Sequence, residues 1–161
     1  MFSLFRLRRS RGPKDLAVEM AGVRLGERVL QAGSGNPGAF AVMAGKTGLT
    51  GRACAVVDTA EAARRLEAAA AEEGVLIEVV TAEGGSWPFF PSSFDVGILD
   101  GNVLLAAPAD KREWRLRDMI RVVRPGGRVL AISSRPLGLA GRLGFSRPDP
   151  EGAARARQLA G

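Results

Sequence analysis

Short apolar runs alternate with amphipathic stretches along this 161-residue chain. An apolar run bounded by turn residues predicts a buried strand, whereas apolar residues spaced three and four apart predict a helix. On this pattern the predicted strands cover residues 28–32, 52–57, 75–80, 94–99 and 128–132. The predicted helices cover residues 15–21, 39–44, 60–73 and 110–123.

Capping and spacing support these helices. Pro37 suits the first turn of the second helix, because no backbone N–H is needed there. Thr59 is placed to cap the third helix. In the fourth helix Leu116, Ile120 and Val123 are spaced to share one face, which predicts that this face packs on the sheet.

Apolar strands separated by helices are typical of an α/β fold with a parallel sheet covered on both faces. Right-handed crossovers then predict a doubly wound, mostly parallel sheet of five strands. Ligands of such sheets bind beyond the carboxyl ends of the strands, near the point where the winding reverses. Here those ends precede residues 33–38, 58, 82–86 and 100–104.

Composition narrows the chemistry. The chain has no His and no Tyr, which excludes a Ser-His-Asp triad and His-ligated metals. Its one cysteine, Cys54, allows no internal disulfide and lies in an apolar strand, where we expect inert packing. No apolar run approaches the ~20 residues that span a bilayer. The length suits one domain and a cytoplasmic location is expected.

The net charge of +6 lies mostly at the two ends of the chain. We predict a basic leader over residues 1–14, an α/β domain over residues 15–134 and a basic tail with a short helix over residues 135–161. Residues 1–11 combine apolar and arginine side chains, so they could contact a membrane surface, contact phosphates, or remain a leader without a partner. A nucleic-acid partner is not expected, because the aromatic residues are not interleaved with a basic stripe.

A glycine loop and a strand-end acid are the main candidate site. Gly33 and Gly35 lie between a predicted strand and a helix, where backbone N–H groups can face a negative group. Asp58 follows the next strand, where a carboxylate can accept both hydroxyls of a ribose. The pattern favours a nucleoside-type ligand, with an unliganded tight turn as the alternative. Gly33, Gly35, Gly38 and Asp58 also satisfy the dinucleotide fingerprint, but no His or Tyr is present to serve hydride chemistry.

Six segments resemble class I S-adenosylmethionine-dependent methyltransferases in order and spacing. They are VLQAGSG, VVD, AEG, WPF, SFDV and VRPGGRV, at residues 29–35, 56–58, 82–84, 87–89, 93–96 and 123–129. The resemblance covers residues 15–134 and is greatest to the quinone-biosynthesis branch and its small-molecule relatives. It implies an S-adenosylmethionine cofactor and methyl transfer to a small or lipid-like acceptor.

The resemblance also implies roles for individual residues. The loop around Gln31 and Gly33 to Gly35, Ser34 included, would hold the methionine end of the cofactor. Asp58 would bind the ribose, Thr59 would flank the adenine, and Glu83 with Gly84 would reach the adenine amino group. Asp100 would line the route to the methyl group and is the candidate catalytic carboxylate. No metal is expected, since methyl displacement can proceed by positioning alone.

The sequence departs from the family pattern at several places. Gln31 stands where the family usually has an acid, Pro37 with Gly38 displaces the third glycine, and Glu83 replaces an aspartate. Only 27 residues follow Ser134, so the chain is expected to be truncated and to lack the C-terminal antiparallel hairpin. The exposed edge of the fifth strand would then be covered by the tail, or would pair with a second copy as a homodimer. These departures keep open a second function, a non-catalytic binding or scaffold protein with weakened cofactor binding.

Overall fold

The computed structural model describes residues 12–133. Its strands are β1 (Arg28–Ala32), β2 (Arg52–Val57), β3 (Glu78–Thr81), β4 (Phe94–Asp100) and β5 (Val123–Ile132). Its helices are α1 (Pro13–Ala21), α2 (Pro37–Thr47), α3 (Ala60–Glu73), α4 (Gly101–Ala106) and α5 (Ala109–Val122). In this part of the chain no helix is long and apolar enough to cross a membrane.

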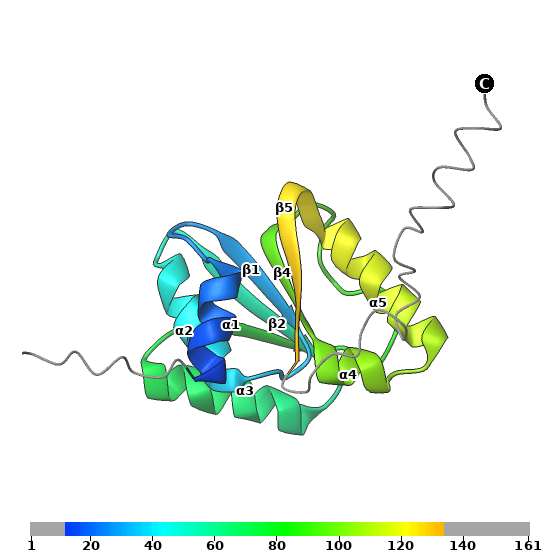
Figure 1. Ribbon diagram of the computed structural model, residues 1–161, viewed down its shortest axis with the longest axis horizontal. Helices are drawn as coiled ribbons and strands as arrows, with labels where there is room; N and C mark the ends of the chain where they lie inside the picture. The colour runs from blue at the N-terminus through cyan, green and yellow to red at the C-terminus, as the bar shows by residue number, and fades with distance from the viewer. Residues whose placement is uncertain (1–11, 134–161) are drawn as a thin grey trace, which may run out of the picture.

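The five strands form one parallel sheet in the order β3-β2-β1-β4-β5 (Figure 1). The chain moves outward from β1 to β3 and then returns to the other side of β1 as β4. The winding therefore reverses between β1 and β4, which is where an open α/β sheet binds its ligands. The predicted α/β class and doubly wound parallel sheet are confirmed.

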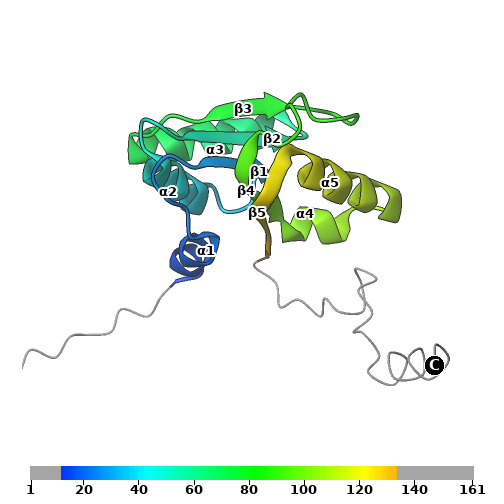
Figure 2. The same cartoon turned by 90° about the horizontal axis from the view of Figure 1, so that it is seen from above.

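Alternate residues of each strand enter two separate apolar layers. Val29 of β1 packs with α1, α2 and α3 on one face of the sheet, and Leu30 packs with α4 and α5 on the other. Figure 2 shows this division, with α4 and α5 on the opposite side of the strands from α1 and α2. Both residues have no exposed surface, as expected for a strand buried on both faces.

Two polar contacts position helices. The first is a helix cap that the sequence predicted, and the second holds a helix beside the sheet. The Thr59 hydroxyl accepts the Ala62 N–H at 3.2 Å, so it caps α3. Arg128 of β5 donates to the carbonyl of Ala21 at 2.9 Å and pairs with Glu27, which anchors the end of α1 beside the sheet. This contact fixes the last residue of α1 near the amino ends of β1 and β4.

The third strand is shorter than predicted. Residues 75–77 continue out of α3 instead of pairing, because the Val75 N–H donates to the Ala70 carbonyl at 2.9 Å in the turn that ends the helix. Only four residues, Glu78–Thr81, pair with β2. The apolar run predicted the strand correctly, but its first residues pack against the core without entering the ladder.

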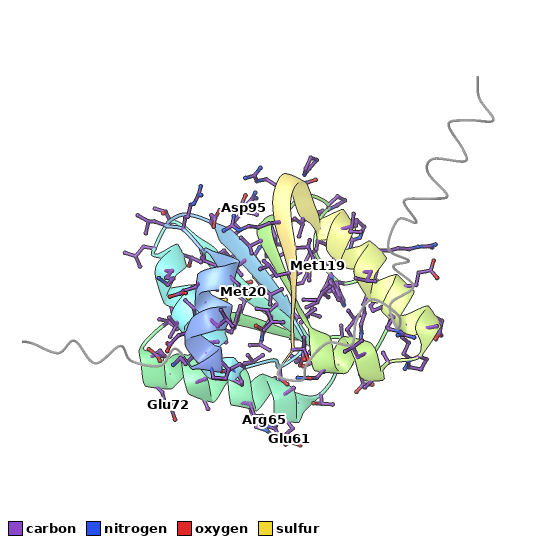
Figure 3. The ribbon with its side chains drawn as sticks, viewed as in Figure 1. Met20, Glu61, Arg65, Glu72, Asp95 and Met119 are labelled. Carbon is purple, nitrogen blue, oxygen red and sulfur yellow. The ribbon has the colours of Figure 1, made fainter. Side chains whose placement is uncertain are left out.

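The fourth predicted helix differs in its buried face. Ile120 is 69% exposed, and the buried residues of α5 are Asp118, Met119 and Val122. Figure 3 shows Met119 between α5 and the strands. Of the expected face, Leu116 and Val123 do pack in the core, but Ile120 was wrong, because Asp118, Met119 and Val122 take the buried positions of α5.

Two features at the ends of α5 and β4 were not predicted. A further helix, α4, follows β4 directly. The last strand begins at Val123, opposite Phe94, and the pairing shifts before Arg128 meets Val96, so residues 124–127 bulge from the ladder. Among residues 12–133 the outer edge of β5 pairs with no other strand. Pairing of that edge in a homodimer stays a prediction. The predicted tail and residues 1–11 of the predicted leader lie outside the described residues, whereas Pro13 and Lys14 of that leader belong to α1.

Asp95 ties together the ends of the strands opposite the candidate site (Figure 3). It accepts the Arg28 N–H at 2.8 Å and pairs with the side chains of Arg28 and Arg124. Burial alone would raise the pKa of Asp95, but the hydrogen bonds from Arg28 and Arg124 outweigh it and lower the pKa to about 2. Asp95 is therefore more acidic in the folded chain than in the unfolded one.

This depressed pKa predicts acid sensitivity. The stabilisation by Asp95 is complete above its unfolded pKa of 3.8 and is lost as the pH falls toward 2. The shift corresponds to about 2 kcal/mol. Urea unfolding at pH 5 and pH 2 should show that Asp95→Asn has lost this part of the pH dependence, whereas Glu113→Gln, in an exposed pair, keeps it. Parallel pH profiles for wild type and Asp95→Asn would contradict the assignment.

Candidate active site

Three cavities are linked in series along the carboxyl ends of the strands. The α2-side cavity, about 420 Å³, lies between α1, α2 and the ends of β1, β4 and β5. The central cavity is only about 20 Å³, and the loop cavity, between residues 83–85 and α5, is about 550 Å³. Leu99 and Asp100 line both the α2-side and central cavities, and Asp58 and Arg115 line both the central and loop cavities.

The glycine loop after β1 approaches Asp100 closely. Gly33 has a φ of +93°, and a Cβ placed on it would lie 2.7 Å from the Cβ of Asp100. Gly35 has a φ of +50° and faces the amide of Gln31 in the same way. Both positions therefore require glycine, for backbone conformation and for space. Figure 1 shows β1 and β4 side by side, ending next to the start of α4.

Two side chains hold this loop from opposite sides. Gln31 is 3% exposed, and its Nε2 donates to the carbonyls of Gly33 at 3.2 Å and Ser34 at 2.9 Å. Asp100 accepts the Gly35 N–H on Oδ2 at 2.9 Å. The neutral amide thus binds loop carbonyls, and the carboxylate of the neighbouring strand binds a loop N–H.

Asp100 also caps the helix that follows it. Its Oδ1 accepts the backbone N–H groups of Asn102 at 3.0 Å and Val103 at 3.3 Å, at the first turn of α4. With the Gly35 N–H, three backbone donors bind this carboxylate. The contacts give Asp100 a positioning role in joining β1 to β4, in addition to its place in the wall of two cavities.

Asp58 forms an ion pair that crosses the central cavity. Its Oδ2 accepts from Nη2 of Arg115, a residue of α5. The Asp58 side chain is 54% exposed, but that of Arg115 is only 14% exposed, so the arginine lies beneath the carboxylate. Sequence reasoning placed Asp58 correctly at the strand end but missed Arg115, since nothing in the spacing of α5 marks it as a partner for a residue 57 positions away.

The remaining predicted residues separate into two groups. Glu83 and Gly84 line the loop cavity together with Asp58, so these three are brought to one place. Thr59 uses its hydroxyl to cap α3, and Ser34 contributes its carbonyl to the bond with Gln31. The structure therefore places most of the expected residues along these neighbouring cavities, with Gln31, Gly35 and Asp100 at the α2 side, whereas Ser34 and Thr59 are not among the lining residues.

A buried ion pair on α5 holds the loop that forms the cleft wall. Asp118, 6% exposed, accepts the Trp87 N–H at 2.6 Å and pairs with Arg121. Arg121 in turn donates to the carbonyls of Phe89 at 2.7 Å and Trp87 at 3.0 Å. Burial would raise the pKa of Asp118, but the bonds from Arg121, Trp87 and Ser86 lower it. Trp87 lines the central cavity, and its ring meets Trp114 edge-on at 5.8 Å between centroids.

The site offers binding groups rather than an activated nucleophile. Burial raises the pKa of the Cys54 thiol to about 12, so this buried cysteine is not a thiolate at neutral pH. Over residues 12–133 no group of three His, Cys, Asp or Glu is placed to hold a metal ion. The arrangement suits a ligand held by loop N–H groups, carboxylates and apolar walls.

The contact between Gly33 and Asp100 yields a stability prediction. Gly33→Ala should lose about 2–4 kcal/mol, from the strained positive φ together with the clash against Asp100. Gly74→Ala is a matched control, because Gly74 also has a positive φ but nothing lies within 4 Å of a Cβ there. Its loss should be about 1 kcal/mol. Equal losses in urea unfolding would show that the clash with Asp100 is relieved without cost.

Comparison with known proteins gives the family. A family model described as a methyltransferase domain matches residues 29–127. The uncharacterized protein Rv1405c of Mycobacterium tuberculosis (strain ATCC 25618 / H37Rv) is 34% identical over 134 residues, which are 80% of this chain and 44% of that protein. The uncharacterized protein Rv1403c of the same strain is 33% identical over 130 residues and is likewise matched by 80% of this chain over 44% of its own length. The chain thus spans less than half the length of these relatives.

Solved structures share the fold. A SAM dependent methyltransferase from Aquifex aeolicus aligns with a TM-score of 0.57 and 19% identity over 70% of this chain and 58% of that one. A SAM-dependent methyltransferase from Thiobacillus denitrificans, in complex with S-adenosyl-L-homocysteine, aligns with a TM-score of 0.55 and 18% identity over 78% and 51%. Because the family model matches more than half of the sequence, this chain belongs to the methyltransferase-domain family, as its motifs predicted.

Proposed function

We propose that this chain binds S-adenosylmethionine along the three linked cavities and transfers its methyl group to a small neutral acceptor. The observation that carries the proposal is the order of the cavities: one beside the glycine loop, one at Asp58 and one beside Glu83. A ligand made of an amino acid, a ribose and a base needs three such compartments in this order. Membership of the methyltransferase-domain family supports the same ligand.

Each compartment has groups that suit one part of the ligand. The α2-side cavity offers the loop at Gly35 and the N-terminal end of α2, which favour a carboxylate. At the central cavity Asp58 can accept hydrogen bonds from ribose hydroxyls. The loop cavity offers Glu83 and the flexible backbone of Gly84, whose φ is +105°, to the polar edge of a base.

The central cavity must widen when a ribose enters it. In this structure Arg115 binds Oδ2 of Asp58, and the central cavity that both residues line is about 20 Å³. A carboxylate has acceptor sites for about four hydrogen bonds, so Asp58 can bind a diol while keeping one bond to Arg115. Since Asp58 is the more exposed partner, we infer that its side chain moves and Arg115 stays.

The chemistry requires little of the protein beyond placement. Bound S-adenosylmethionine would supply an activated methyl group: the nucleophilic atom of the acceptor bonds to the methyl carbon, the carbon–sulfur bond breaks with its electron pair kept on sulfur, and the proton of the acceptor passes to solvent. Asp100 and Gln31 hold the loop so that the ligand is fixed, and the wall formed by Trp87 excludes water. Such positioning supplies much of the rate of displacement reactions without a protein nucleophile.

The lining of the α2-side cavity indicates the acceptor class. Its walls include the apolar side chains of Met43, Ile98 and Ile132, and no Lys or Arg is among the described residues that line it. Asp100 is the one carboxylate among them, and it binds three backbone N–H groups. A neutral acceptor with apolar parts fits the apolar side of this cavity, beside the amino-acid end of the cofactor, which supports the quinone-like or lipid-like class that the sequence favoured. Membrane contact through residues 1–11 stays a prediction.

A second function, a non-catalytic binding or scaffold protein, is favoured by one observation. Asp58 is already engaged by Arg115, and the central cavity is too small for a sugar as it stands. If Asp58 and Arg115 do not separate, the protein keeps its fold but does not bind the cofactor. Direct measurement of ligand binding separates the two functions.

Isothermal titration of the full chain with S-adenosylmethionine tests the proposal. We expect micromolar binding, and a loss of about 10–100-fold in affinity in Asp58→Ala, as for removal of charge-assisted hydrogen bonds. Glu61→Gln is the matched control, because Glu61 lies three residues further on and pairs with Arg65 on the outer face of α3 (Figure 3). The control should bind as wild type does. Absence of binding heat in the wild type would favour the scaffold.

A further inference from the structure

We infer that Asp100 makes the site prefer a positively charged sulfonium over the neutral thioether that remains after methyl transfer. This inference rests on the proposed function and assigns to one side chain the distinction between S-adenosylmethionine and S-adenosylhomocysteine. These two ligands share the adenosine and the amino acid and differ in one methyl group and one positive charge. A large difference in affinity between them requires a charged group in the site, because a methyl group contributes little binding energy by itself.

The position of Asp100 in the cleft is the first argument. Asp100 lines both the α2-side and central cavities, and Leu99 is the one other residue that does so among their linings. A ligand with its amino acid in one cavity and its ribose in the next must cross this junction. The sulfur of S-adenosylmethionine joins those two parts, so the junction is where its charge falls.

The second argument is that Asp100 keeps its negative charge without a cationic partner. Two carboxylates are buried among residues 12–133, Asp118 at 6% and Asp100 at 7% exposure. Asp118 pairs with Arg121, whereas Asp100 is bound by backbone N–H groups and by no Lys or Arg among the ion pairs of the described residues. The carboxylate of Asp100 is therefore available to attract a positive charge on a ligand in the cleft.

The other groups of the cleft cannot supply the same distinction. Asp58 is compensated by Arg115, and the groups it would bind are the ribose hydroxyls that both ligands share. Gln31 is neutral and donates to loop carbonyls. Among the described residues that line the α2-side cavity, Asp100 is the one carboxylate. Loss of the sulfonium charge on methyl transfer then removes an attraction to Asp100, which promotes release of the product.

The test compares the dissociation constants of S-adenosylmethionine and S-adenosylhomocysteine by titration of the full chain. In Asp100→Asn, which keeps the size of the side chain, the preference for S-adenosylmethionine over S-adenosylhomocysteine should fall about tenfold, as for removal of one charge close to the sulfonium. Asp58→Asn is the matched control, since it should weaken both ligands alike and leave their ratio unchanged within about twofold.

Gln31→Glu provides a test of opposite sign that does not depend on the folding of Asp100→Asn. It adds a carboxylate to the same cavity, so the preference for the charged ligand should increase. An unchanged ratio of the two dissociation constants in Asp100→Asn would overturn the inference. If circular dichroism shows that Asp100→Asn does not fold, an unchanged ratio in Gln31→Glu would overturn it instead. An equal change of the ratio in Asp58→Asn would also overturn it. If the wild type binds neither ligand, the proposed function fails as well, whereas binding with unchanged ratios defeats this inference alone.

Discussion

The hydrogen bond from the Gly35 N–H to Asp100 is the contact on which the rest of the site depends. It joins the loop after β1 to the end of β4, the two strands between which the winding of the sheet reverses. Gly33 must be glycine because Asp100 stands against it, and α4 begins where it does because the same carboxylate caps it. One buried side chain thus fixes the floor of the cleft and the start of a helix.

Carboxylates bound by arginines stabilise the rest of the molecule in a similar way. Asp95 holds the opposite end of the sheet, and Asp118 holds the loop of Trp87 to α5. Asp58, at the mouth of the cleft, is paired with Arg115. Against this background Asp100 is distinct, because its donors are backbone N–H groups, which leave its net charge in place for a cationic ligand.

Several sequence predictions were confirmed because they rest on local rules. Arg28–Ala32, Arg52–Val57 and Ala60–Glu73 have the predicted bounds, since strand periodicity and the Thr59 cap act within a few residues. Gly33, Asp58 and Glu83 line neighbouring cavities because parallel strands all end at the same edge, while their roles toward a cofactor stay predictions. The family resemblance was confirmed for the same reason, as its motifs are those strand ends.

The sequence by itself determined the α/β class, the bounds of three elements and the placement of Gly33, Asp58 and Glu83 at strand ends, because periodicity and turn chemistry are local. Tertiary structure decided which polar groups meet. Arg115 reaches Asp58 across 57 positions, and Gln31 and Asp100 share one loop, through packing that spacing does not encode. It also decided that α5 buries Asp118 rather than Ile120, because the loop at Trp87 needed an acceptor.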